Sequence, residues 1–384
     1  MRIFGHGYNY VRQEADQMRA FRLMAVVCLA AAVMLITAPL RPEENKVKIV
    51  FFSPRGPDDI FWEQFASFMK EAIDDLGMEM KVYFANGNHV KMVEQAEHAL
   101  KEDNPSMLVF QNFKKQGRVI LEMAEAARVP SFIVNAGFSE RDELGKPREK
   151  FKYWIGEMLP DDEEAGFVLA DILIRNAPSR PDGSVYMVAL TGNIADSASA
   201  ERQRGLERAV RIHPHVRLQQ VFSTDWSSDM ARMKFNLLKK SRYPDTSVVW
   251  AAGDAVALGV ISGAGDLDLK VGTDIITGGV DWSAEGLRSV LAGEMTATMG
   301  GHFMEGAWVA VLAYDYFHGK DFAAETVRMR SRMSAVTKVN AESYINALGR
   351  ENWGKIDFRK FSKALNSAAL QYDFSVQSVL NQVK

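Results

Sequence analysis

The sequence predicts an α/β protein made of two doubly wound parallel-sheet lobes. From Lys46 onward, short β-branched or aromatic runs alternate with amphipathic stretches that close at Gly or Pro. This alternation is typical of parallel sheets that carry helices on both faces and are connected by right-handed crossovers. The alternation forms two series that divide near Pro160, and 384 residues are enough for two hydrophobic cores.

The first series begins with a buried strand at 46–53. Apolar residues at helical spacing from Phe61 to Leu76 then mark one face of a helix that ends at Gly77. Further strands are expected at 78–85, 106–110 and 131–136, with helices at 90–100 and 117–127.

The second series begins with four acidic residues, 161–164, directly before the apolar stretch 166–174. Acidic side chains favour a helix N-terminus through the helix dipole, and a metal site is the alternative interpretation of this run. Further strands are expected at 184–190, 216–223, 247–252, 274–280 and 295–301, with helices at 201–210, 230–239, 255–262 and 284–291.

The N-terminal region predicts export. Arg19 and Arg22 precede the apolar run 23–38, which has the form of an export signal and is short for a membrane span of about 20 residues. The start is Met1 or Met18. Pro39 directly after the run disfavours cleavage, so a periplasmic protein is expected, either free or tethered by an uncleaved segment.

Composition excludes several classes of function. The only cysteine, Cys28, lies in the apolar run, so the body has no disulfide, thiolate zinc site or cysteine nucleophile. The body is mildly acidic, which argues against a nucleic-acid partner. His213 and His215 flank a proline without zinc-ligand spacing, and no nucleotide, calcium or nucleophile-elbow motif is complete. No enzyme activity, cofactor or metal is therefore expected.

Six short motifs lie in places where an open parallel sheet binds ligands, at or after strand ends. They are FFSPRGPDDIFW (51–62), AERQRG (200–205), TDWS (224–227), AAGDAVALG (251–259), GGVDWSAEGL (278–287) and GEMTATMGG (293–301). In this order they resemble the type I periplasmic sugar-binding proteins, such as the ribose- and galactose-binding proteins, over roughly residues 46–344. LacI-type repressors share these lobes, but they begin with a basic helix-turn-helix where this chain has an apolar segment.

The resemblance implies a site of aromatic plates and polar groups, because sugars present apolar faces and a belt of hydroxyls. Phe61 and Trp62 match the aromatic pair on one ligand face, and Trp226 matches the aromatic residue of the opposite lobe. Arg202 fits the bidentate donor. The structural alternatives are core packing for the aromatic residues and a solvated helix charge for Arg202.

The acidic positions and the departures from the family pattern complete the implied site. Asp281 fits the carboxylate acceptor, and Asp254 matches the aspartate of the family's Asn-Asp motif, although both could be cap or turn residues. Gly253 replaces the motif's Asn, Asn135 begins the segment where an Asp-Arg pair is expected, and His302 follows the position of an expected glutamine. The pocket is therefore expected to be roomier and less polar than a pentose site, open to a larger sugar derivative, a furanose, an autoinducer-like molecule or a more apolar solute.

The resemblance also implies a three-segment hinge, with the chain crossing between lobes near residues 157, 301 and 331. The expected parts are an export signal or anchor at 1–42, an N-terminal lobe at 43–157 plus 302–331, a C-terminal lobe at 158–301 plus 332–344, and an extension at 345–384. The extension is expected to form one or two helices on a lobe. Its expected anchors are Trp353, Phe358, Phe361, Tyr372 and Phe374.

The implied function is capture of a small polar ligand, a sugar or sugar derivative, by a monomer that delivers it to the permease of an ABC transporter. The alternative is a periplasmic receptor that reports the ligand to a membrane kinase or chemoreceptor, with a ligand that could be less polar. Both roles use the same hinge closure. Arg202→Ala and Asp281→Ala are expected to abolish binding with little loss of stability.

Overall fold

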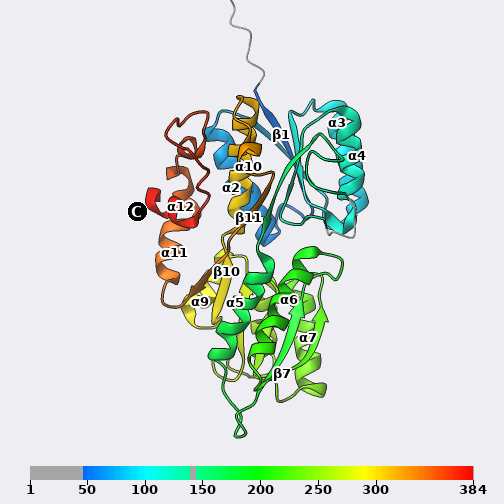
Figure 1. The fold of residues 1–384 in the computed structure, drawn as a ribbon. Helices are drawn as coiled ribbons and strands as arrows, with labels where there is room; N and C mark the ends of the chain where they lie inside the picture. The colour runs from blue at the N-terminus through cyan, green and yellow to red at the C-terminus, as the bar shows by residue number, and fades with distance from the viewer. Residues whose placement is uncertain (1–45, 139–143, 384) are drawn as a thin grey trace, which may run out of the picture. The chain divides into compact units, whose positions relative to one another are not determined.

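The computed structural model describes residues 46–138 and 144–383, all within the compact unit Lys46–Lys384. The expected export segment lies outside the described residues. Two six-stranded sheets with alternating helices form this unit, which confirms the α/β fold class (Figure 1). No helix in the described part of the chain is long and apolar enough to cross a membrane.

The N-terminal lobe contains the sheet β11-β5-β4-β3-β1-β2, in which every pairing is parallel. Its strands are β1 (Lys48–Ser53), β2 (Glu79–Phe84), β3 (Met107–Phe110), β4 (Ser131–Val134), β5 (Trp154–Pro160) and β11 (Arg328–Ser331), and its helices are α2 (Ile60–Asp75), α3 (His89–Glu102), α4 (Gly117–Ala127) and α10 (Glu305–Phe317). Alternate residues of β1 pack in different cores: Phe51 lies in the cluster with α2 and α10, and Phe52 in the cluster with α3 and α4. Both faces of β1 are therefore buried, as its continuous apolar run predicts.

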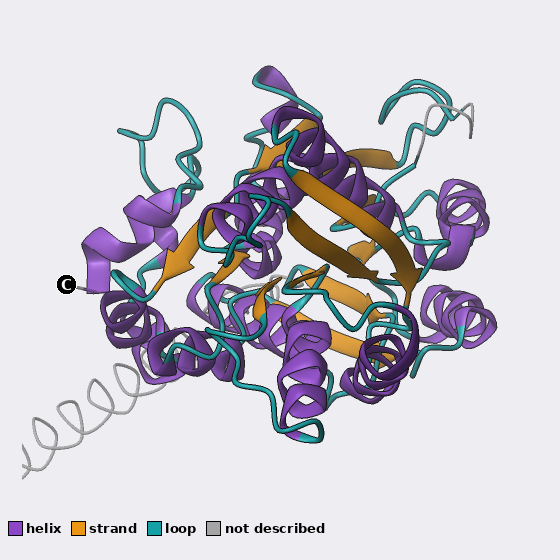
Figure 2. Ribbon diagram, turned by 90° about the horizontal axis from the view of Figure 1, so that it is seen from below, coloured by secondary structure: helices purple, strands orange, loops and turns teal. Residues whose placement is uncertain are grey.

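The C-terminal lobe contains the sheet β12-β10-β9-β8-β6-β7. Its strands are β6 (Val185–Thr191), β7 (Val216–Ser223), β8 (Val248–Ala251), β9 (Ile276–Val280), β10 (Ala297–Gly300) and β12 (Ser334–Thr337), and its helices are α5 (Asp162–Arg175), α6 (Ser197–Ile212), α7 (Ser228–Leu237), α8 (Asp254–Gly265) and α9 (Ala284–Ala292). Helices flank the strands on both sides (Figure 2). The edge strand β12 runs antiparallel to β10, so this sheet is not wholly parallel as expected.

The chain passes between the two sheets at three places that lie close to the expected ones. The first follows the end of β5 at Pro160, a few residues later than the expected position near 157. The second lies between Gly300 and the 3₁₀ helix η4 (His302–Met304), and the third lies between β11 and β12. The alternation pattern did not reveal β5, β11 or β12, the strands next to these crossings.

Two glycines allow helices α5 and α6 to cross at close range. A Cβ atom at Gly166 would lie 2.1 Å from the carbonyl oxygen of Arg202, and one at Gly205 would lie 2.0 Å from the carbonyl oxygen of Glu163. No side chain larger than hydrogen fits at either contact. The close crossing brings the first turn of α5 against the middle of α6.

The C-terminal extension contacts both lobes. Helix α11 (Ala341–Leu348) packs on α9 and β12, whereas the 3₁₀ helices η6 (Arg350–Lys355) and η7 (Phe358–Phe361) pack on α2. The final helix α12 (Val376–Val383) lies against α11 and η6. The chain therefore passes from one lobe to the other a fourth time, which the sequence did not predict.

Aromatic side chains hold the extension on the N-terminal lobe, and they are the expected anchors. The Trp353 ring meets Phe68 with centroids 5.1 Å apart, and Phe374 stacks on Trp308 at 4.9 Å. The buried carboxylate of Asp315 on α10 accepts hydrogen bonds from the Ser362 hydroxyl at 2.5 Å and the Tyr372 hydroxyl at 2.8 Å. Apolar packing and a buried carboxylate that accepts hydrogen bonds from the extension therefore hold the extension together on the N-terminal lobe.

Candidate functional site

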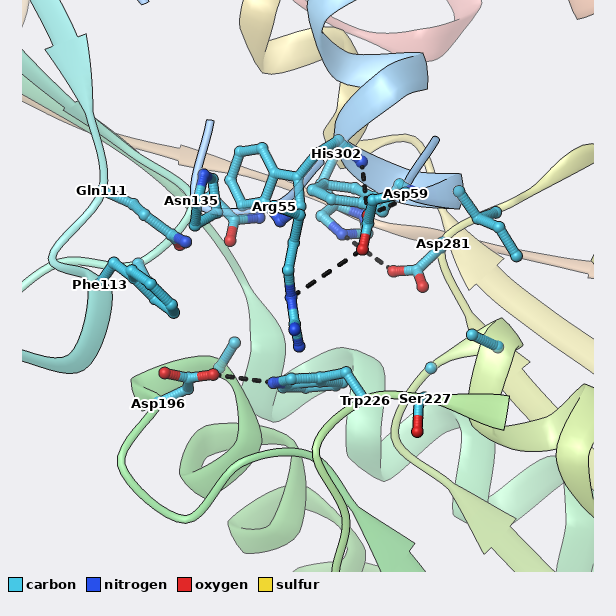
Figure 3. A pocket seen from close by; sticks show the side chains of 18 of the residues that line it. Arg55, Asp59, Gln111, Phe113, Asn135, Asp196, Trp226, Ser227, Asp281 and His302 are labelled. Atoms are coloured by element: carbon cyan, nitrogen blue, oxygen red, sulfur yellow. Dashed lines mark hydrogen bonds and ion pairs between the residues drawn. The ribbon is translucent and has the colours of Figure 1, made fainter. Parts of the chain in front are cut away.

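A cavity of about 280 Å³ lies between the two lobes, at the carboxyl ends of strands from both sheets (Figure 3). Its walls come from loops after β1, β3, β4, β6, β7, β8, β9 and β10. An open α/β sheet binds ligands at this edge, since the loops there supply side chains while the strands hold them in place. Among the described residues no His, Cys, Asp or Glu cluster could hold a metal ion.

The aromatic wall of the N-terminal lobe is set by the start of α2. The Asp59 carboxylate caps this helix by accepting hydrogen bonds from the backbone amides of Phe61 at 3.2 Å and Trp62 at 3.0 Å. The Phe61 ring lies edge-on to Trp62 at 5.1 Å and stacks on the His302 ring at 4.6 Å. Burial raises the pKa of Asp59.

Two amide side chains on the same lobe face the cavity without partners of their own. Gln111 follows β3 and Asn135 follows β4, and both are largely buried. Neither side-chain amide hydrogen-bonds to another described residue, and Figure 3 shows both beside the cavity. Because their amide groups face the cavity and have no protein partner, they are free to pair with a ligand's hydroxyl groups.

Trp226 forms the opposite wall, on the C-terminal lobe. Its indole N–H donates to the Asp196 carboxylate at 2.8 Å, which fixes the plane of the ring (Figure 3). A Cβ atom at Gly192 would lie 2.0 Å from this ring, so glycine is required beneath it. Arg55 reaches across from the N-terminal lobe and donates to the Asp225 carbonyl oxygen at 2.5 Å.

Three non-glycine residues of the cavity have a positive φ. The non-glycine residues Asn135, Trp226 and Asp281 have φ values of 60°, 72° and 136° and all line the cavity. Such conformations cost about 1–3 kcal/mol each and persist where the surroundings impose them, often at binding sites. The strain supports a functional role for this edge of the sheets.

Arg202 is the centre of a buried charge cluster. Its side chain is 4% exposed, and its Nε donates to the Asp162 carboxylate at 2.6 Å. One terminal nitrogen donates to the Ala252 carbonyl oxygen at 2.7 Å and lies 3.7 Å from the Asp281 carboxylate. Asp162 belongs to the acidic run of the sequence, so one member of that run balances a buried charge.

His302 is neutral and its tautomer follows from its neighbour. Burial lowers the pKa of His302 to about 3. Its Nε2 lies 3.3 Å from the terminal nitrogen of Arg202 and 3.5 Å from the Asp281 carboxylate. A guanidinium can only donate, so acceptance from the nearer Arg202 places the proton on Nδ1. This Nδ1–H is buried and has no partner among the described groups, which leaves a donor available to a ligand.

Asp281 and Asp254 form a pair of adjoining carboxyl groups with different surroundings. Asp281 lines the cavity, and burial raises its pKa to about 7, opposed by the charge of Arg202. Asp254 is fully buried and accepts hydrogen bonds from the Ser283 hydroxyl at 2.8 Å and the Thr298 hydroxyl at 2.6 Å. Burial and repulsion from Asp281 also raise the pKa of Asp254 to about 7.

The structure brings together seven of the eight residues predicted from the sequence. Lining the cavity are Phe61, Trp62, Asn135, Arg202, Trp226, Asp281 and His302. Asp254 does not line it, because its carboxyl group is directed at Ser283 and Thr298 and so ties the start of α8 to the loop after β9 and to strand β10. Its expected contact with a ligand is therefore not supported.

Sequence reasoning missed seven polar residues of the cavity: Arg55, Asp58, Asp59, Gln111, Asp196, Ser227 and Ser228. Gln111 directly follows β3, so the strand-end rule could have found it. Arg55 and Asp59 lie within the motif 51–62, in which only the aromatic pair was expected to contact a ligand. With these groups present, the cavity is richer in polar side chains than expected.

A match to the family model described as periplasmic binding protein domain covers residues 49–321. The chain belongs to the periplasmic binding protein family. Proteins of this family are periplasmic. The similar proteins described next are sugar-binding proteins, and this chain is therefore a periplasmic sugar-binding protein. A periplasmic sugar-binding protein from Pseudomonas fluorescens has a crystal structure that is 30% identical, with a TM-score of 0.79 over 87% of this chain and 99% of that chain.

Two further similar proteins, with lower sequence identity, are described by the sugar that they bind. The galactofuranose-binding protein YtfQ of Escherichia coli (strain K12) is 19% identical over 282 residues, which is 72% of this chain and 83% of YtfQ. The crystal structure of an ABC transporter periplasmic solute binding protein from Actinobacillus succinogenes 130z, with bound D-allose, is 15% identical. It has a TM-score of 0.68 over 78% of this chain and all of that chain. These likenesses confirm the type I fold of the periplasmic binding protein.

Proposed function

We propose that this periplasmic binding protein captures a sugar or sugar derivative in the cavity between its lobes and delivers it to the permease of an ABC transporter. The observation that carries the proposal is the pair of unpartnered amides, Gln111 and Asn135, across the cavity from the Trp226 ring. An aromatic face opposite free hydrogen-bonding groups matches the apolar face and hydroxyl belt of a sugar.

The ligand is proposed to lie between the aromatic pair Phe61 and Trp62 and the Trp226 ring. Arg202 has one terminal nitrogen that contacts both Ala252 and Asp281, whereas the other has only His302 as a polar partner and keeps one N–H for a ligand. The Nδ1–H of His302 adds a donor. Closure then excludes water and ties both lobes to the ligand. We propose no covalent step, so the protein is a carrier and not an enzyme.

The test is a thermal-shift screen of the purified full-length chain against furanoses, pyranoses, amino sugars and polyols, followed by calorimetric titration of each hit. A ligand that binds only the folded state raises the melting temperature. Gln111→Leu keeps the side-chain size and removes the amide, and we expect it to weaken binding about 5- to 100-fold.

The matched control is Gln220→Leu, which makes the same change at an exposed position on β7. Its affinity should equal that of the wild type. Silence from every sugar, or equal affinity in Gln111→Leu, contradicts the proposal.

A further inference from the structure

The inter-lobe cavity has more carboxylates than cations to balance them. Of the two arginines among its described lining residues, Arg202 is already paired at 2.6 Å with Asp162, a buried carboxylate outside the lining. The other is Arg55. Four carboxylates line the cavity with it: Asp58, Asp59, Asp196 and Asp281. The cavity is therefore short of positive charge before a ligand binds.

Arg55 balances only part of this excess. Its one ion pair in the described chain is with Asp59, whose carboxylate lies 3.9 Å from the Arg55 Nε, beyond hydrogen-bond distance. Burial raises the pKa of Asp196, although the Trp226 indole, Arg55 and Lys114 oppose the shift. A carboxyl group whose pKa is raised lies in surroundings that do not fully compensate its negative charge.

Asp59 and Asp281 bring two of these carboxylates to the cavity from different lobes. Asp59 precedes α2 in the N-terminal lobe, whereas Asp281 follows β9 in the C-terminal lobe, and Figure 3 shows both at the cavity. Burial and repulsion from Asp59 raise the pKa of Asp281 to about 7, although Arg202, 3.7 Å away, opposes the shift. Oδ2 of Asp59 and Oδ1 of Asp281 accept no hydrogen bond from any described residue, so each can pair with a ligand.

An unpartnered amide in the same cavity is independent support for a ligand there. Gln111 is 7% exposed, and its side chain hydrogen-bonds to no other described residue. Figure 3 shows it directed at the cavity. An amide side chain offers both a donor and an acceptor, so it can bind the hydroxyl groups of a molecule that also reaches the two carboxylates.

We propose that the ligand of this site is an amino sugar, whose positively charged amino group lies between Asp59 and Asp281. This inference rests on the proposed function and names the class of sugar. An ammonium group has three donors and no acceptor, so it can pair with both carboxylates at once and offset the repulsion between the two lobes. A hydroxyl group brings one donor and no charge, and hydrogen bonds between ionised groups are roughly twice as strong as neutral ones.

The experiment titrates the full-length chain calorimetrically, at neutral pH, with three matched pairs of sugars. D-glucosamine, D-galactosamine and D-mannosamine are each compared with the parent hexose, which carries a hydroxyl group in place of the amine. We expect at least one amino sugar to bind about tenfold or more tightly than its parent.

Asp59→Asn and Asp281→Asn locate the amine, and each should lower the preference for the amino sugar over its parent by about tenfold. Asparagine keeps the side-chain size and also caps helices well, so α2 should begin as before in Asp59→Asn. An unchanged melting temperature verifies that each variant folds. Asp74→Asn, at an exposed carboxylate in the last turn of α2, is the matched control and should keep the preference of the wild type.

The outcomes separate this inference from the proposed function. If neutral sugars bind and no amino sugar binds more tightly than its parent, the charged amine is overturned and sugar capture stands. A preference that survives in both Asn variants overturns the placement of the amine between the two carboxylates. If no sugar of either kind binds, both proposals fail.

Discussion

Removing Arg202 should destabilise the protein as well as disturb its site. Arg202 and Asp162 are 4% and 3% exposed, and their contact of 2.6 Å is among the most buried ion pairs of the described chain. Arg202→Ala leaves the Asp162 carboxyl group without its partner, and breaking a buried pair in this way costs about 3–5 kcal/mol. The structure therefore supports a different prediction for Arg202 than the little loss of stability expected from the sequence.

The assay is urea unfolding of the full-length chain, followed by tryptophan fluorescence. The matched control is Arg204→Ala, two residues further along α6, where the pair with Glu163 is 55% and 38% exposed. An exposed pair contributes about 0–1 kcal/mol. The double variant with Asp162→Ala should recover part of the loss, because no buried carboxyl group is then left unpaired.

The reasoning is refuted if Arg202→Ala loses no more stability than Arg204→Ala. It is also refuted if the double variant is less stable than Arg202→Ala by the full cost of a second lost interaction. The result matters for the binding proposal, since loss of ligand binding in Arg202→Ala would otherwise be read as loss of a contact alone.

Two further predictions follow from buried carboxyl groups. Because the pKa of Asp254 is raised to about 7, its protonated form contributes stability that is present at low pH and lost as the pH rises through 7. The free-energy cost of Asp254→Asn, measured by urea unfolding, should therefore be smaller at pH 8 than at pH 5, and an equal cost at both contradicts this account. Asp315→Ala removes the acceptor for Ser362, Lys363 and Tyr372, so it should cost at least about 2 kcal/mol and speed tryptic cleavage after Lys363. Asp373→Ala, at an exposed carboxylate of the extension, is the control, and similar cleavage rates in the two variants would count against the anchoring role.

Much of the fold could be predicted because the central strands are buried on both faces. Runs such as 49–52 and 248–252 are apolar throughout, and amphipathic helices follow them at regular spacing. Strand β11 gives no such signal, since its four residues, Arg328–Ser331, alternate between exposed and half-buried positions at the edge of a sheet. Its assignment depends on pairing with β5, which lies far away in the sequence.

The site residues that match a motif of the family could be predicted from the sequence. The residues whose role depends on a tertiary contact could not. Phe61 and Trp226 follow from motifs. Asp162 was interpreted only as part of a helix-terminal acidic run, because its partner Arg202 lies 40 residues away in the chain and meets it only through the close crossing of α5 and α6. The orientation of Asp254 likewise depends on Ser283 and Thr298, which lie 29 and 44 residues away in the chain.

The order of strands in the first sheet has a consequence for synthesis on the ribosome. Strand β5 pairs with β4 on one side and with β11 on the other, but β11 is translated only after strands β6 to β10 of the C-terminal lobe. Until then the nascent N-terminal lobe has an open edge at β5, where a strand of another chain could pair. The lobe that is translated first thus completes its sheet only after most of the second lobe has been made, so the two lobes cannot mature strictly one after the other.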